Sequence, residues 1–210
     1  MPASRLPLFP LSLVLLPGEP VPLHIFEPRY KEMTRVCLDE QRPFGIVRAS
    51  PDGTAEVGCA ARIARVVTRY ADGRLDLVAA GESRFRVVQI HRDRPYLTAE
   101  VDPVDDGPGG APSADRERVV ARHMKLLELA GETIHPEAYA AGPAVSFVVG
   151  RRAGLDLDGR QRLLEMTSET ERLRFLAEHL DTLLRRVKRA HDVRERARGD
   201  GHAGPPPEVG

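Results

Sequence analysis

Residues 21–30 carry the sequence VPLHIFEPRY, in which an extended segment changes directly into a helix. Residues 21–26 predict a strand. Proline is favoured in the first turn of a helix, because its missing N–H would have no partner there, so Pro28 predicts a helix start. We expect this helix to cover residues 28–40, because apolar side chains recur at helical spacing at Tyr30, Met33, Val36 and Cys37.

Short apolar runs separated by turn residues continue on both sides of this segment. Pro51-Asp52-Gly53 predicts a turn, and Ala71-Asp72-Gly73 predicts a hairpin. The strands expected around them cover residues 44–49, 56–70, 74–80, 84–91 and 96–101. The apolar stretch 6–16 is also expected to form strands, and it is too short to span a bilayer. Six or seven strands with one inserted helix predict a small closed or nearly closed β-barrel over residues 5–105.

The apolar period changes from two to 3.6 after a Gly/Pro-rich connector at residues 107–113. Residues 114–198 are therefore expected to form a separate helical subdomain, with four helices packed together. The spacing of a capping box occurs twice, at Asp158 with Gln161 and at Ser168 with Glu171. Residues 199–210, rich in Gly and Pro, predict a disordered tail.

Charge and composition argue against nucleic acid as a partner. The 31 basic and 31 acidic residues cancel, so the chain has no overall basic field for a phosphate backbone. Aromatic residues make up 5% of the chain and tryptophan is absent, which leaves few platforms for stacking bases. The run 185–198 holds seven basic and two acidic residues. We interpret it as a solvated helix end, where cations are favoured by the helix dipole.

The residues that usually carry catalysis or bind metals are not arranged for either. Cys37 and Cys59 have neither a metal-site spacing nor a disulfide framework, and we expect buried free thiols in a reducing cytosol. His24 with Glu27 is interpreted as structural rather than as an acid–base pair. The carboxylates at Asp102, Asp105 and Asp106 are interpreted as a solvated turn. The sequence predicts no catalytic site, no metal and no cofactor.

Two blocks of sequence carry a family resemblance. The first comprises LPLFPL at residues 6–11, LLPG at 15–18 and PLHIFEPRY at 22–30. The second comprises VGCAARI at residues 57–63, the Asp72-Gly73 hairpin and GESRFRV at 81–87. In their order and spacing, these blocks closely resemble the N-terminal domain of Lon proteases. They are more similar still to stand-alone bacterial proteins built from that domain.

The resemblance implies an α+β fold, with a PUA-like β-barrel followed by a C-terminal helical bundle. It also implies a role in capturing unfolded or tagged protein segments. The chain contains no Gly-x4-Gly-Lys-Ser/Thr phosphate loop and no protease block with a Ser–Lys pair. We therefore expect a non-catalytic, cytoplasmic binding module, an adaptor or holdase for unfolded proteins that works with a protease or a chaperone. The alternative is an RNA-binding PUA-like protein.

Four residues are candidates for binding such a segment: Phe26, Arg29, Tyr30 and Arg84. Phe26 and Tyr30 lie four residues apart across the strand–helix corner, so we expect one to line the core and the other to reach the rim. Arg29 and Arg84 are expected to hydrogen-bond carbonyl groups of the bound segment or to select acidic flanks. Main-chain pairing would add affinity and side pockets selectivity. In the alternative interpretation, Phe26, Tyr30 and Phe85 fill the barrel.

Overall fold

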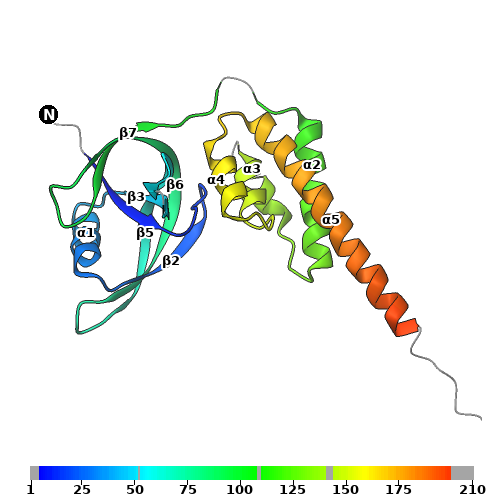
Figure 1. The fold of residues 1–210 in the computed structure, drawn as a ribbon, viewed down its shortest axis with the longest axis horizontal. Coiled ribbons are helices and arrows are strands. Elements are labelled where there is room, and N and C mark those ends of the chain that lie inside the picture. Colours follow the sequence, from blue (N-terminus) through cyan, green and yellow to red (C-terminus); the bar gives the residue numbers. More distant parts are fainter. Residues whose placement is uncertain (1–4, 52, 108–109, 141–143, 200–210) are drawn as a thin grey trace, which may run out of the picture.

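The computed structural model describes residues 5–51, 53–107, 110–140 and 144–199, with side chains as far as residue 189. Figure 1 shows a strongly curved sheet on one side of the molecule and the C-terminal helices on the other. The last helix, α5 (Glu169–Gly199), extends beyond its neighbours. The chain therefore has an α+β fold, as predicted.

The sheet contains seven strands and is mainly antiparallel. The strands are β1 (Leu6–Leu11), β2 (Pro20–Ile25), β3 (Phe44–Ser50), β4 (Gly53–Thr54), β5 (Val57–Arg69), β6 (Leu75–His91) and β7 (Thr98–Pro103). β1 pairs with β7 on one side and, in parallel, with β3 on the other, so the sheet curls back to its first strand. β2 adds to the first half of β6. The finer prediction, a PUA-like β-barrel, stays a prediction.

The helix expected inside the β-rich half is α1 (Pro28–Asp39), with proline in its first turn. It buries Tyr30, Met33, Thr34 and Cys37. These residues recur every three or four positions, so one face of the helix packs against the sheet. The predicted helix at residues 28–40 is confirmed.

The ring of Phe85 fills the space inside the curled sheet. It belongs to a small apolar cluster made by Leu6, Leu8, Val47, Ala60, Phe85 and Ala99. A Cβ atom at Gly45 or Gly58 would lie 2.6 Å from this ring, so both positions need glycine to leave room for it. The interpretation of Phe85 as a core residue is confirmed.

One strand was predicted as two. The sequence suggested a break between residues 80 and 84, but β6 runs unbroken from Leu75 to His91. Gly81 marks a close approach rather than a turn, because a Cβ atom there would lie 2.5 Å from the carbonyl oxygen of Leu16. The loop before β2 therefore packs directly against the middle of β6.

The C-terminal half is helical between short connections. After α2 (Ser113–Leu129) and a 3₁₀ turn (Pro136–Tyr139) follow α3 (Val145–Gly150), α4 (Leu157–Glu165) and α5. α5 packs along α2 and also contacts α3. The description of these helices as a bundle, and the division into subdomains 5–105 and 114–198, stay predictions. Of the predicted tail, residues 200–210 lie outside the described part of the chain.

The predicted cap residue is confirmed at α5 and is wrong at α4. The N–H of Glu171 donates to Ser168 Oγ at 3.4 Å, as expected at the start of α5. At α4 the cap is Asp156, whose Oδ1 accepts from the N–H of Gly159 at 2.7 Å. Asp158 instead forms an ion pair with Arg48 of β3 at 2.6 Å.

The two halves share one apolar core. Leu16, from the loop before β2, is fully buried and lies against Gly150 of α3. Polar contacts reinforce this junction: Arg160 donates to the carbonyl oxygen of Val14 at 2.9 Å, and the Gln161 amide donates to that of Val57 at 3.0 Å. The sheet and the helices are therefore held together by packing and by hydrogen bonds.

None of the helices in the part of the chain that the structure describes is long and apolar enough to cross a membrane.

Candidate functional site

Phe26 is exposed at the end of β2. Along β2, Val21, Leu23 and Ile25 point inward and the residues between them point outward. Phe26 follows Ile25, so this alternation turns its ring toward solvent, where 58% of the residue is exposed. The ring stacks on His24 with centroids 5.9 Å apart.

His24 is fixed by residues on the neighbouring hairpin. It lies opposite Asp76 in the β2–β6 pairing, and its Nδ1 is 2.6 Å from Asp76 Oδ1. Tyr70, directly after β5, donates its hydroxyl to the other oxygen of Asp76 at 2.6 Å. Hydrogen bonds from His24 and Tyr70 hold the pKa of the Asp76 carboxyl below its ordinary value. The interpretation of His24 as structural holds, with Asp76 rather than Glu27 as its partner.

Phe26, His24 and Tyr70 therefore form an exposed group of rings, which we call the aromatic corner. The edge of Tyr70 meets His24 with centroids 6.2 Å apart, and the Arg74 guanidinium lies 4.9 Å from the Tyr70 ring. Sequence reasoning missed Tyr70 and Asp76. The hairpin turn at residues 71–73 was predicted, but the register that sets its flanks beside β2 cannot be seen in one sequence.

Arg29 lies at the same end of β2 but is already paired. Its Nη2 is 2.7 Å from Glu27 Oε2, and its guanidinium lies 4.6 Å from the ring of Tyr30. Half of the Arg29 side chain is exposed. It therefore forms a charged rim beside Phe26.

Tyr30 belongs to the core rather than to the rim. Only 8% of it is exposed, and its ring centroid lies 4.2 Å from that of Phe9. Burial raises the pKa of its hydroxyl. The structure therefore separates the two aromatic residues as predicted, with Tyr30 inside and Phe26 outside.

Arg84 is not brought together with Phe26 and Arg29. It is buried between the sheet and the helices, where it donates to the carbonyl oxygen of Leu164 at 3.0 Å and to Asp106 at 2.6 Å. Asp106 also binds Arg172, so the interpretation of the 102–106 carboxylates as a solvated turn is wrong for Asp106. Arg84 links the two halves of the fold, across a separation of 80 residues that short-range patterns cannot reveal.

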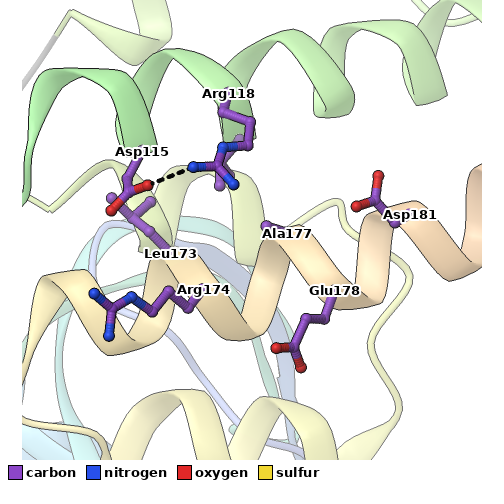
Figure 2. A pocket seen from close by; sticks show the side chains of 8 residues that line it. Asp115, Arg118, Leu173, Arg174, Ala177, Glu178 and Asp181 are labelled. Carbon is purple, nitrogen blue, oxygen red and sulfur yellow. Dashed lines mark hydrogen bonds and ion pairs between the residues drawn. The ribbon is translucent and has the colours of Figure 1, made fainter.

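A hollow lies between α2 and α5, and its apolar lining residues are Val119, Leu173 and Ala177. Figure 2 shows charged side chains around it, including the ion pair of Asp115 with Arg118 at 2.9 Å. Asp181 on its rim is bound by Arg122 of α2 at 2.6 Å. Asp115 and Asp181 are thus both paired with arginines of α2, and this hollow is best explained as the seam between two packed helices.

The cysteines are not suited to nucleophilic chemistry. Both are buried, and burial raises the pKa to about 11 for Cys37 and to about 12 for Cys59. Both thiols therefore stay protonated and poorly nucleophilic at neutral pH. Within the described residues, no group of three or more His, Cys, Asp or Glu side chains is placed to hold a metal ion.

Comparison with known proteins places this geometry in context. Residues 5–182 match the family described as the ATP-dependent protease La (LON) substrate-binding domain. Lon protease 2 of Myxococcus xanthus is 25% identical over 215 residues, which cover 93% of this chain and 26% of that protein. Protein cereblon of Danio rerio is 37% identical over 95 residues, which cover 41% of this chain and 22% of cereblon. The chain thus spans about a quarter of the length of the curated relatives it matches.

Solved structures show the same fold. The Lon N-terminal domain protein from Xanthomonas campestris superposes with a TM-score of 0.66 at 28% identity, covering 82% of this chain and 96% of that one. The N-terminal domain of a Mycobacterium avium complex Lon protease gives a TM-score of 0.63 at 22% identity, covering 85% of this chain and 98% of that one.

Proposed function

The chain belongs to the family of LON substrate-binding domains, and from that premise we propose that it binds exposed apolar segments of unfolded or tagged proteins at the aromatic corner. It acts as an adaptor or holdase in the cytoplasm, with a protease or a chaperone as its further partner, and catalyses no reaction of its own. RNA binding is not favoured, because the charges of the chain cancel.

The exposed ring of Phe26 is the main observation that supports the aromatic corner as the binding site. A lone exposed apolar residue is ordinary on a protein surface. Phe26, however, is stacked on His24, which in turn meets Tyr70, so three rings form one surface. Asp76 holds His24 and Tyr70 at 2.6 Å each, so these two rings lose little freedom when a segment binds.

Side chains are expected to supply most of the affinity, because the free edge of β2 is poorly suited to main-chain pairing. The N–H of Gly81 on β6 donates to the carbonyl oxygen of Glu19 at 2.9 Å, so odd-numbered residues of the β2 segment face β6. The backbone groups of Pro20, Pro22 and His24 then face the free edge. Two of these three residues lack an N–H, which limits the addition of another strand.

Affinity is expected in roughly the micromolar range, because an unfolded segment loses conformational entropy when it is held. Such weak binding suits a module that passes its substrates on.

The test is a titration of fluorescein-labelled, reduced and carboxymethylated lactalbumin, which stays unfolded in buffer. The double variant Phe26→Ala, Tyr70→Ala should bind it about tenfold more weakly than the unchanged protein, because aromatic residues dominate binding surfaces. Val88→Ala is the matched control, since Val88 is also 58% exposed but lies on β6 away from the corner. Equal affinity of the double variant and the control would refute this location.

A further inference from the structure

The outward-facing side chains of β2, β6 and β5 continue from the aromatic corner as two rows. Strand register places His24, Asp76 and Thr68 side by side in the first row, and Pro22, Val78 and Arg65 in the second. Pro22 and Arg65 are exposed and Val78 is partly exposed, so the second row offers a small apolar floor with a cation at its end.

Arg65 differs from three neighbouring arginines because it has no partner among the described residues. Arg69 also lacks one, but strand register places it level with the buried Leu75 rather than in either row. Arg29 pairs with Glu27, Arg62 with Glu82 and Arg74 with Asp72, at 2.6 to 2.8 Å. Arg65 forms no hydrogen bond, ion pair or ring contact with any residue in the described part of the chain.

Carboxylates near the corner do not cancel this charge, because each is already engaged. Glu27, Glu82 and Asp72 hold the arginines named above, and Asp76 accepts from His24 and Tyr70. Within the two rows, Arg65 is therefore the charged side chain without a described partner, and its guanidinium can bind an acidic group.

We propose that the aromatic corner and Arg65 together select extended segments in which an acidic residue follows or precedes an aromatic one at a spacing of two to four residues. This inference rests on the proposed function and names the class of segment that the same site prefers. The aromatic residue packs on Phe26 and Tyr70, and the aspartate or glutamate pairs with Arg65.

The spacing follows from strand geometry. His24 lies two residues and Phe26 four residues from Pro22, which is level with Arg65. Each residue of an extended chain advances about 3.3 Å, so a segment lying along β6 covers the same distance with the same number of residues. An acidic residue eight positions away would lie beyond Arg65.

The experiment compares three fluorescent twelve-residue peptides, each with one phenylalanine. The first carries Asp three residues from it, the second Asn at that place, and the third Asp eight residues away. The unchanged protein should bind the first about two- to fivefold more tightly than the other two, the range for an exposed ion pair. This preference should shrink at about 1 M salt, which screens exposed charges.

Arg65→Gln should remove the preference and leave binding of the Asn peptide unchanged. Arg92→Gln is the control, because Arg92 is another exposed arginine without a described partner, beyond the far end of β6. A preference that survives in Arg65→Gln, or that is absent while the Asn peptide binds normally, overturns this inference alone. If none of the peptides binds, the proposed function fails and the inference falls with it.

Discussion

Arg84 and Arg172 donate to the same oxygen atom, Oδ1 of Asp106, at 2.6 and 2.7 Å. Both guanidinium groups also face the ring of Phe147, at 5.4 and 4.6 Å from its centroid. Arg84 comes from β6 and Arg172 from α5, so one carboxylate joins the sheet to the last helix. The junction that fixes the two halves of the fold thus depends on Asp106.

Replacing Asp106 by Asn should destabilise the protein by about 2 to 3 kcal/mol, somewhat less than for a fully enclosed ion pair. The physical reason is that two buried guanidinium groups would lose their shared counter-charge. Urea unfolding followed by circular dichroism measures the change. Asp102→Asn is the matched control, because Asp102 belongs to the same acidic stretch but forms no hydrogen bond or ion pair with any described residue. Equal stability of the two variants would argue against this role for Asp106.

Asp106 should also contribute to the loss of stability in acid. Hydrogen bonds from Arg172 hold the pKa of its carboxyl below the ordinary value. The contribution of this carboxylate to stability is complete above about pH 3.9, the pKa of an aspartate in the unfolded chain. It is lost as the pH falls through the lower pKa that the carboxyl has in the folded protein. Below about pH 4, the free energy of unfolding should therefore fall less steeply in Asp106→Asn than in the unchanged protein. Parallel curves would contradict this assignment.

Gly58→Ala should destabilise the curled sheet by about 1 to 3 kcal/mol, the usual range for overpacking. The new Cβ atom would lie 2.6 Å from both the carbonyl oxygen of Ile46 and the ring of Phe85. Gly110→Ala serves as the control, because no atom of the described residues lies within 4 Å of a Cβ atom there. Thermal unfolding of both variants measures the difference, and an unchanged melting temperature for Gly58→Ala would show that the sheet can relax.

Much of this architecture could be predicted because it is encoded locally. Pro28 and the helical spacing after it gave α1 nearly to the residue, and the turn at Ala71-Asp72-Gly73 gave the β5–β6 hairpin. Ser168 marked the start of α5 for the same reason, since a helix cap needs only its own neighbours.

The predictions that were wrong concern residues whose surroundings are formed by parts of the chain distant in sequence. Gly81 falls in the break that was expected between two strands, but it lies within β6, where the nearby carbonyl group of Leu16 leaves no room for a side chain. Arg84 resembled a surface residue, but its partners Leu164 and Asp106 come from the other half of the fold. The aromatic corner was only partly foreseen, because Tyr70 joins Phe26 through strand register.

Binding should tolerate blocked main-chain donors in the client. Pro20 and Pro22 remove two N–H groups from the free edge of β2, so the proposed site relies on side chains. A phenylalanine-containing peptide with N-methyl groups at alternate residues should therefore bind as its unmethylated form does, as measured by fluorescence anisotropy. A large loss of affinity on methylation would instead indicate strand addition.

The most direct measurement places a photoreactive benzophenone analogue of phenylalanine at position 26, in place of Phe26, and illuminates the protein with unfolded lactalbumin. A second protein carries the same analogue in place of Val88, which is equally exposed but lies on β6, away from the corner. The proposed function predicts strong cross-linking from position 26, competed by excess unlabelled client, and little from position 88. Equal cross-linking from both positions, or none from position 26, would contradict capture at the aromatic corner.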